Sequence, residues 1–309
     1  MPRPPMGSFE PTSAMHRTPR TRFAPSVSGH LHLGHIVSAV YVWGIGHARG
    51  GSIALRLEDH DRSRFKSEFE ASILDDLDWL GLVPDAGTTA EFRGGRSRFR
   101  QSDNGERYGD ALDALTRRGS VYVCACRRID RGPADGGPGH ELCYPGTCRE
   151  RALEDGPSRR LRVRMDPGTE SFQDLALGPQ RQDPASQCGD LVARDSAGNW
   201  TYQFAVTVDD IEQGIDLVIR GQDLLSSTGR QIRLARLLGR DTPPAYYHHP
   251  LVTGADGRKL SKREFAKGIR DLRAEGRSPG SVLGEAAYLG GLLPAPRDLT
   301  AAELPGLFR

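Results

Sequence analysis

The sequence contains no apolar run that approaches the roughly 20 residues needed to cross a bilayer, and its N-terminus lacks the apolar core of a signal peptide. We therefore expect no membrane partner and a cytoplasmic location. The first 20 residues are rich in proline, carry scattered arginines and show no apolar period. This composition predicts a flexible arm over residues 1–20.

The chain also lacks a strong excess of charge of either sign. Lysine plus arginine number 42 and aspartate plus glutamate number 40 in 309 residues. A uniformly basic surface that coats nucleic acid is therefore excluded, and any site for a polyanion must be a local patch. Only five cysteines occur, and four of them fall between positions 124 and 148. In a chain of this size that crowding favours metal binding over a disulfide framework.

The most informative stretch is residues 22–35, where an extended run ends in a turn and becomes a helix. Proline, serine and glycine residues end the run, and Gly34 lets the backbone approach a ligand closely. An apolar helix is expected over residues 36–47. The N–H groups and the positive dipole end at the start of a helix suit a bound phosphate, and His32 and His35 would both point at it.

Two predicted strands end in charged residues. Residues 52–58 alternate as a strand should and end in Glu58, and residues 215–223 form a second buried strand that contains Arg220. Open α/β sheets bind ligands at the carboxyl ends of their strands, so this pattern favours a doubly wound sheet with a ligand site at that edge. The adjacent aspartates at 209–210 follow an apolar run, and the pattern alone gives them no role.

The cysteine cluster fits a tetrahedral zinc site. Cys124 and Cys126 follow a short apolar run, and Cys148 lies beyond a loop rich in glycine and proline. These three are the firm ligand candidates. The fourth ligand is left open among three nearby residues: Cys143, His140 and Tyr144.

The rest of the chain before residue 251 predicts helices and, at residues 160–165 and 190–194, two further strands. Apolar residues recur at helical spacing over residues 66–80, 103–119 and 226–238, and Gly81 fits a C-cap of the first helix. From residue 251 the sequence predicts a strand, an Asp-Gly turn and a basic loop with lysines at 259 and 262. Two lysines on such a loop would swing onto a polyphosphate and neutralise its charge.

The early histidine motif and the late lysine motif together resemble a known family. His-Leu-Gly-His at 32–35 and Lys-Leu-Ser-Lys at 259–262 are similar to the two signature motifs of class I aminoacyl-tRNA synthetases. Four more motifs resemble the glutamyl and glutaminyl branch: Arg-Phe-Ala-Pro-Ser at 22–26, Arg-Leu-Glu-Asp at 56–59, Val-Asp-Asp at 208–210 and Ile-Arg-Gly at 219–221. Within that branch, the short chain and the cysteine cluster resemble the glutamyl-Q tRNA(Asp) synthetases, which lack an anticodon-binding domain.

The resemblance covers residues 22 to about 265 and implies an α/β fold. We expect a doubly wound, Rossmann-type parallel sheet, an inserted zinc-containing α+β lobe and a short helical C-terminal stub. The implied boundaries are residues 21–119 and 200–265 for the two halves of a nucleotide-binding domain, 120–199 for the inserted lobe and 266–309 for the stub.

The resemblance also implies roles for individual residues. Glutamate would be held by Arg22, Ser26, Glu58, Tyr202 and Arg220, since arginines match its carboxylates and Glu58 matches its ammonium group. ATP would be bound by His32, Gly34, His35 and Lys262. The catalytic residues would be His32, His35, Lys259 and Lys262. Zinc would be bound by Cys124, Cys126, Tyr144 and Cys148. Val27 and Gln203 depart from the family's usual proline and asparagine, and neither change removes a charge.

The implied activity is ATP-dependent activation of glutamate to glutamyl-adenylate, with Mg2+ on the pyrophosphate, and transfer of the glutamyl group to queuosine in the anticodon of tRNA(Asp). The expected partners of this monomeric enzyme are ATP, L-glutamate and one tRNA(Asp) anticodon arm, and its single zinc ion would be structural. The glutamyl-Q family activates glutamate without tRNA, whereas glutamyl-tRNA synthetases generally need tRNA(Glu). Two other functions stay open: a truncated glutamyl-tRNA synthetase charging tRNA(Glu), and a catalytically silent tRNA-binding paralogue.

Overall fold

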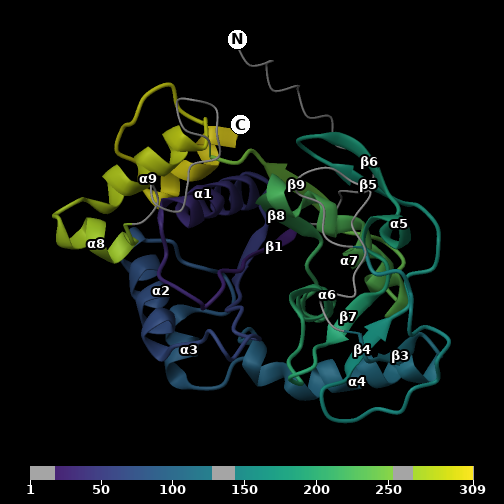
Figure 1. Cartoon of the computed structure of the whole chain (residues 1–309). Coiled ribbons are helices and arrows are strands. Elements are labelled where there is room, and N and C mark those ends of the chain that lie inside the picture. The colour runs from purple at the N-terminus through teal and green to yellow at the C-terminus, as the bar shows by residue number, and fades with distance from the viewer. Residues whose placement is uncertain (1–17, 127–142, 253–266, 309) are drawn as a thin grey trace.

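The structure is a computed structural model that describes residues 18–126, 143–252 and 267–308 (Figure 1). The described part of the chain begins with a βαβ unit made of β1 (Arg20–Phe23), α1 (Leu33–Ala48) and β2 (Ser52–Leu55). Strands β1 and β2 pair in parallel, with Arg22 opposite Ala54. The turn predicted to hold the ligand therefore joins a strand to the start of a helix, as the sequence indicates.

A second group of strands extends this layer. Strands β5 (Glu170–Asp174), β9 (Ala245–His249) and β8 (Leu217–Gly221) run parallel, and β6 (Gly178–Gln182) forms an antiparallel edge beside β5. The backbone N–H of Asp216 donates to the Arg20 carbonyl at 3.1 Å, and the Arg20 N–H donates to the Asp216 carboxylate at 2.6 Å. These bonds place β1 beside β8, so the two groups of strands continue one another.

Helices cover both faces of this layer. Leu217 and Ile219 of β8 belong to the core formed with α1, whereas the intervening Val218 packs with Ile232 of α7 (Thr228–Leu237). Alternate residues of a strand point to opposite faces, so α1 and α7 lie on opposite sides. The described residues thus have the doubly wound arrangement that the sequence predicts.

The C-terminal segment is helical and packs against α1. It contains α8 (Ile269–Ala274), α9 (Pro279–Leu289) and the 3-10 helix η4 (Ala301–Phe308). Helix α1 is buried over most of its circumference, because the sheet lies on one side and α9 and η4 on the other. The Tyr41 hydroxyl of α1 donates to the Gly290 carbonyl at 2.7 Å. A Cβ atom on Gly44 would lie only 2.0 Å from the Phe308 ring. The absence of a side chain at Gly44 therefore allows η4 to pack directly against α1.

The helices between β2 and β3 confirm the helical spacing in the sequence. Helix α2 (Ser67–Leu80) ends at Gly81, which has φ 70° and closes the helix in the left-handed conformation. Helix α3 (Thr89–Gly94) follows, and the 3-10 helix η1 (Gln101–Asn104) leads into α4 (Gly105–Arg117).

A three-stranded antiparallel sheet forms a second core at the end of the molecule opposite to α8 and α9 (Figure 1). Its order is β3 (Val121–Cys124), β4 (Arg160–Val163) and β7 (Leu191–Arg194). Helices α4 and α6 (Tyr202–Glu212) pack against it, and α5 (Pro184–Cys188) precedes β7. Among the described helices, none is both long enough and apolar enough to cross a membrane.

Two expectations about strands need correction. The hairpin β5–β6 falls inside the range expected for the inserted lobe, yet β5 pairs with β9 in the main sheet. The strand expected from residue 251 does not begin there, because β9 ends at His249 and residues 251–252 have no regular structure; residues 253–266 lie outside the described residues. Pro250 has no N–H to donate, so it cannot continue the hydrogen-bond ladder.

Candidate active site

The turn after β1 brings Ser26 beside Glu58. The two residues form an isolated parallel bridge, and the Glu58 N–H donates to the Pro25 carbonyl at 3.0 Å. The Val27 N–H donates in turn to the Glu58 carbonyl at 3.1 Å. Val27, which replaces a common proline, therefore supplies a donor that proline lacks.

His32 and His35 form a reciprocal cap at the start of α1. The Gly34 N–H donates to His32 Nδ1 at 3.1 Å, and the His32 N–H donates to His35 Nδ1 at 3.1 Å. Burial lowers the pKa of His32, and burial together with His32 lowers the pKa of His35 to about 3. Both rings are therefore neutral at pH 7. Because each Nδ1 accepts a hydrogen bond, the ring proton lies on Nε2, which can donate to an anion.

A buried network of charges lies at the ends of β1 and β2. Asp210 accepts from Arg22 Nε at 3.1 Å and from Arg56 Nη1 at 2.6 Å. Arg56 is fully buried and also donates to Glu58 at 3.2 Å. Burial raises the pKa of the Asp210 carboxyl, but the charges of Arg22 and Arg56 lower it by more than burial raises it. The pKa of Asp210 therefore lies below its usual value. Arg56 and Asp210 thus hold Arg22 and Glu58 in place.

The neighbouring Asp209 contacts the same network through Arg56, whose Nε lies 3.9 Å from its carboxylate. It is completely buried and accepts hydrogen bonds from Gln101 at 2.8 Å and from the Tyr108 hydroxyl at 2.9 Å. Burial raises its pKa, and the charge of Arg56 opposes that rise. The two adjacent aspartates, to which the sequence pattern gives no role, therefore organise the residues that it does single out. The feature of the sequence that could have indicated this role is the Val-Asp-Asp motif at residues 208–210.

Arg220 and Tyr202 face the same region from β8 and α6. Arg220 is 4% exposed and donates to Gln231 at 2.7 Å, to Thr228 at 2.8 Å and to His248 at 3.0 Å. Burial raises the pKa of the Tyr202 hydroxyl, the charge of Glu58 adds to that rise, and those of Arg220 and Arg22 oppose it. The side chains expected to bind glutamate therefore gather around one centre.

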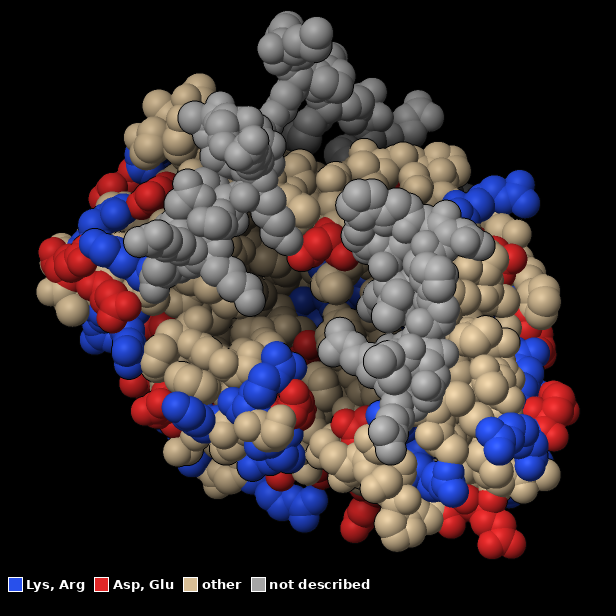
Figure 2. All heavy atoms as spheres, viewed as in Figure 1, with Lys and Arg blue, Asp and Glu red and all other residues tan. Residues whose placement is uncertain are grey.

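The surface of the molecule is hollowed (Figure 2), and a cavity lies beside Tyr202. Figure 2 shows a hollow in this face with basic and acidic atoms at its bottom. Next to Tyr202, a cavity of about 300 Å3 extends toward the antiparallel sheet and is lined in part by Arg162, Gln203 and Arg230. Gln203, which replaces a common asparagine, donates to Ser227 at 2.8 Å and accepts from Gln231 at 2.8 Å. Lys259 and Lys262, the other predicted catalytic residues, lie outside the described residues.

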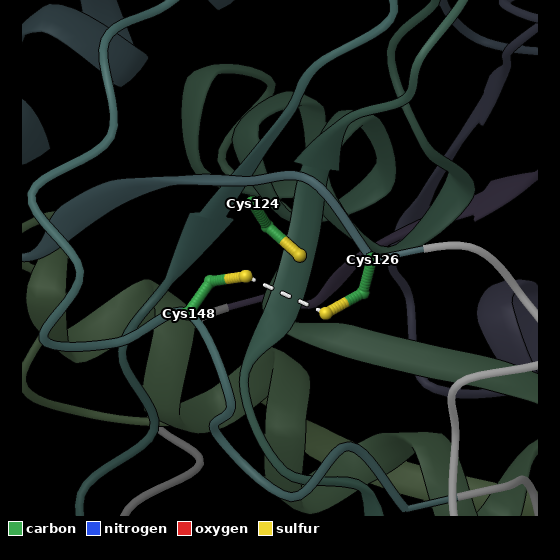
Figure 3. Close-up of side chains that lie close together, drawn as sticks. All are labelled: Cys124, Cys126 and Cys148. Atoms are coloured by element: carbon green, nitrogen blue, oxygen red, sulfur yellow. Dashed lines mark hydrogen bonds between the residues drawn. The ribbon is translucent and has the colours of Figure 1, made fainter.

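The three firm cysteine candidates converge (Figure 3). The sulfur atoms of Cys124, Cys126 and Cys148 all lie within 4.8 Å of one another. The Tyr144 hydroxyl is 3.5 Å from the Cys124 sulfur and 3.8 Å from that of Cys126. The Cys143 sulfur instead contacts the Ala185 carbonyl at 3.8 Å. Three soft sulfur donors with an adjacent phenol oxygen make a donor set that zinc accepts. His140 lies outside the described residues.

Comparison with known proteins agrees with this geometry. The family described as "tRNA synthetases class I (E and Q), catalytic domain" matches residues 19–299. A glutamate-tRNA synthetase structure from Elizabethkingia anophelis superimposes with a TM-score of 0.75 and 25% sequence identity, and the match covers 93% of this chain and 65% of that one. The chain therefore belongs to the class I tRNA synthetases of the E and Q group.

Curated relatives give the narrower family. The glutamyl-Q tRNA(Asp) synthetase of Symbiobacterium thermophilum is 41% identical over 93% of this chain and 91% of its own length. That of Nitratidesulfovibrio vulgaris is 39% identical over 93% of both chains. A protein named glutamate–tRNA ligase 2 from Cereibacter sphaeroides is 36% identical, but this chain spans only 64% of it. Within the class, the chain belongs to the glutamyl-Q tRNA(Asp) synthetases.

Proposed function

We propose that this protein activates glutamate with ATP to form glutamyl-adenylate and then transfers the glutamyl group to queuosine in the anticodon of tRNA(Asp). The observation that carries the proposal is the convergence of Arg22, Glu58, Tyr202 and Arg220 at the carboxyl edge of the sheet, in a chain whose full-length relatives bear the glutamyl-Q name. Glutamate carries two carboxylates and one ammonium group, and the site offers two arginines and one carboxylate.

In the proposed glutamate site, the arginines bind carboxylate and Glu58 binds the ammonium group. Guanidinium groups match carboxylates through paired hydrogen bonds. Glu58 accepts a hydrogen bond from Arg56 at 3.2 Å, and this contact orients its carboxylate. The Tyr202 hydroxyl and the neighbouring Ser26 would complete the polar lining.

In the proposed ATP site, the triphosphate lies against the start of α1. The Nε2–H groups of His32 and His35 donate to phosphate oxygens, and Gly34 allows the close approach. The loop with Lys259 and Lys262 would add positive charge, and Mg2+ would screen the pyrophosphate. These groups stabilise charge that grows on the phosphate as the reaction proceeds.

The proposed reaction has two steps and needs no enzyme base in the first. A glutamate carboxylate oxygen attacks the α-phosphorus in line, and the bond from that phosphorus to the bridging oxygen breaks, which releases pyrophosphate. A queuosine hydroxyl then attacks the carbonyl carbon of the adenylate, the bond from that carbon to the phosphate oxygen breaks, and AMP leaves with the hydroxyl proton as the ester forms. The neutral His32 and His35 can stabilise the charge that grows on the phosphate oxygens, because each donates a hydrogen bond from Nε2 without having to gain a proton.

We further propose that Cys124, Cys126, Tyr144 and Cys148 bind one zinc ion with a structural role. The Arg162 guanidinium lies 3.6 Å above the Tyr144 ring, and the Cys148 N–H donates to the Tyr144 oxygen at 2.9 Å. Both contacts favour the phenolate that a metal ligand must become. The metal would join β3 to the segment before β4.

The test is glutamate-dependent ATP–pyrophosphate exchange with purified protein in the absence of tRNA. Exchange is expected with glutamate and not with glutamine. Labelled glutamate should then transfer to queuosine-containing tRNA(Asp) and not to the same tRNA with guanosine at that position. Exchange that needs tRNA(Glu), followed by charging of that tRNA, would replace this proposal with a truncated glutamyl-tRNA synthetase; no exchange in either case would leave a silent RNA-binding paralogue.

A further inference from the structure

Three neighbouring parallel strands place a line of buried polar side chains behind Arg220. Arg220 of β8 is the register partner of His248 on β9, and Asp174 lies at the end of β5, next along the sheet. Asp174 Oδ2 and His248 Nδ1 are 2.5 Å apart, and His248 Nε2 receives the Nε–H of Arg220 at 3.0 Å. Asp174 and His248 are both fully buried, so this line is shielded from water.

The hydrogen bonds fix which nitrogen of His248 carries the proton. Arginine can only donate, so His248 Nε2 must be an acceptor. The proton therefore lies on Nδ1, where the Asp174 carboxylate receives it. The other oxygen of Asp174 accepts the N–H groups of Ala176 and Leu177, each at 2.9 Å. Asp174 consequently holds His248 in the one neutral form that can accept from Arg220.

The described hydrogen bonds hold Arg220 in place without bonding an anion directly to it. Its three described acceptors are the His248 ring, the Gln231 side-chain carbonyl and the Thr228 hydroxyl, all of them uncharged. A guanidinium has five N–H donors, so two more stay available, one on each terminal nitrogen. These N–H groups are left for a ligand carboxylate. By contrast, Arg22 is bonded directly to the Asp210 carboxylate.

We infer that Asp174 and His248 are positioning residues that set the affinity of Arg220 for a carboxylate of glutamate. This inference rests on the proposed function, because it takes Arg220 as a glutamate ligand. Asp174 acts indirectly: it selects the tautomer of His248, and His248 in turn contacts Arg220. Asp174 would not touch the substrate itself.

The sharpest variant is Asp174→Asn, which changes no shape. The N–H groups of Ala176 and Leu177 require an oxygen at one side-chain position, so the asparagine must turn its NH2 group toward His248. His248 Nδ1 then becomes an acceptor and its proton moves to Nε2, where it opposes the Arg220 Nε–H. We expect the KM for glutamate in exchange to rise about tenfold to a hundredfold, with the KM for ATP and kcat changing much less.

A matched control is Glu170→Gln in the same strand. Glu170 is also buried, but it binds Arg233 and Arg236 on α7, and among the described contacts none joins it to the residues that bind Arg220. This variant should leave the KM for glutamate unchanged. If Asp174→Asn fails to fold, His248→Gln and His248→Leu serve instead, since glutamine keeps an acceptor near Nε2 and leucine removes it; only leucine should raise the KM by about tenfold or more.

The tautomer gives a readout that does not depend on activity. Nitrogen-15 NMR of the ring should find the proton of His248 on Nδ1 in the wild-type protein and on Nε2 in Asp174→Asn. A wild-type proton on Nε2, or an unchanged glutamate KM in both Asp174→Asn and His248→Leu, would overturn the inference. An inactive wild-type protein would count against the proposed function alone, because the tautomer result stands apart from it.

Discussion

The carboxylate of Asp210, which is 13% exposed and bonded to two buried arginines, gives the most demanding prediction. Asp210 joins Arg22 at 3.1 Å and Arg56 at 2.6 Å, with the two arginine side chains 4% and 0% exposed. Removing one partner of a buried ion pair costs roughly 3–5 kcal/mol, because the remaining charge stays buried. In Asp210→Asn, Arg56 keeps Glu58 at 3.2 Å and Asp209 at 3.9 Å. We therefore expect a loss near the lower end, about 3 kcal/mol of unfolding free energy.

Urea unfolding at pH 7 measures this loss. The control is Asp78→Asn, which removes an ion pair with Arg93 whose side chains are 47% and 43% exposed, and it should cost less than about 1 kcal/mol. The pKa of Asp210 is lowered in the folded state, so its contribution is complete above the unfolded pKa and is lost as pH falls through the folded value. The gap between wild type and Asp210→Asn should therefore shrink below about pH 4. Equal losses in the two variants at pH 7 would refute the argument.

Three further predictions concern separate parts of the molecule. Elemental analysis should find one zinc per chain, lost in Cys148→Ser and kept in Cys188→Ser, since Cys188 lies outside the sulfur cluster; equal zinc in both variants would remove the proposed site. Gly44→Ala should lower stability by about 1–3 kcal/mol despite the better helix propensity of alanine, because its Cβ would meet the Phe308 ring, and Phe308→Ala should restore part of the loss in the double variant. Because the pKa of His35 falls to about 3, its contribution to stability is complete above about pH 6.5 and is lost as pH falls toward 3. In His35→Gln, which keeps the helix cap, the slope of stability against pH in that window should be smaller, and an unchanged slope would contradict the assignment.

The parts of the fold that sequence predicts are those in which local chemistry and tertiary structure agree. Helix α2 follows from its apolar spacing and from Gly81, which alone among neighbouring residues tolerates a φ of 70° without strain. The three clustered cysteines follow from residue type and spacing, and the structure places their sulfurs together.

The missed strands are those whose buried positions are polar. In β5 the buried residues are Glu170, Phe172 and Asp174, so only one is apolar. Glu170 is satisfied by arginines of α7 and Asp174 by His248 on another strand. Hydrophobic periodicity cannot detect a strand whose burial depends on partners tens of residues away. The same reason hides Asp210, because its partner Arg22 lies 188 residues earlier.

The contrast between the two arginines explains how this site would choose its amino acid under the proposed function. Glutamate and glutamine are almost the same shape, so packing alone separates them poorly, and charge must do so. Arg22 already faces the Asp210 carboxylate, whereas the described partners bonded to Arg220 are uncharged. A buried cation without a bonded anion is unfavourable, so where the side-chain carboxylate of glutamate is the group that meets Arg220, it relieves a cost that the neutral amide of glutamine cannot. Selectivity for glutamate would then come from holding Arg220 in one orientation without a directly bonded counter-ion. Asp174 and His248 would maintain that arrangement.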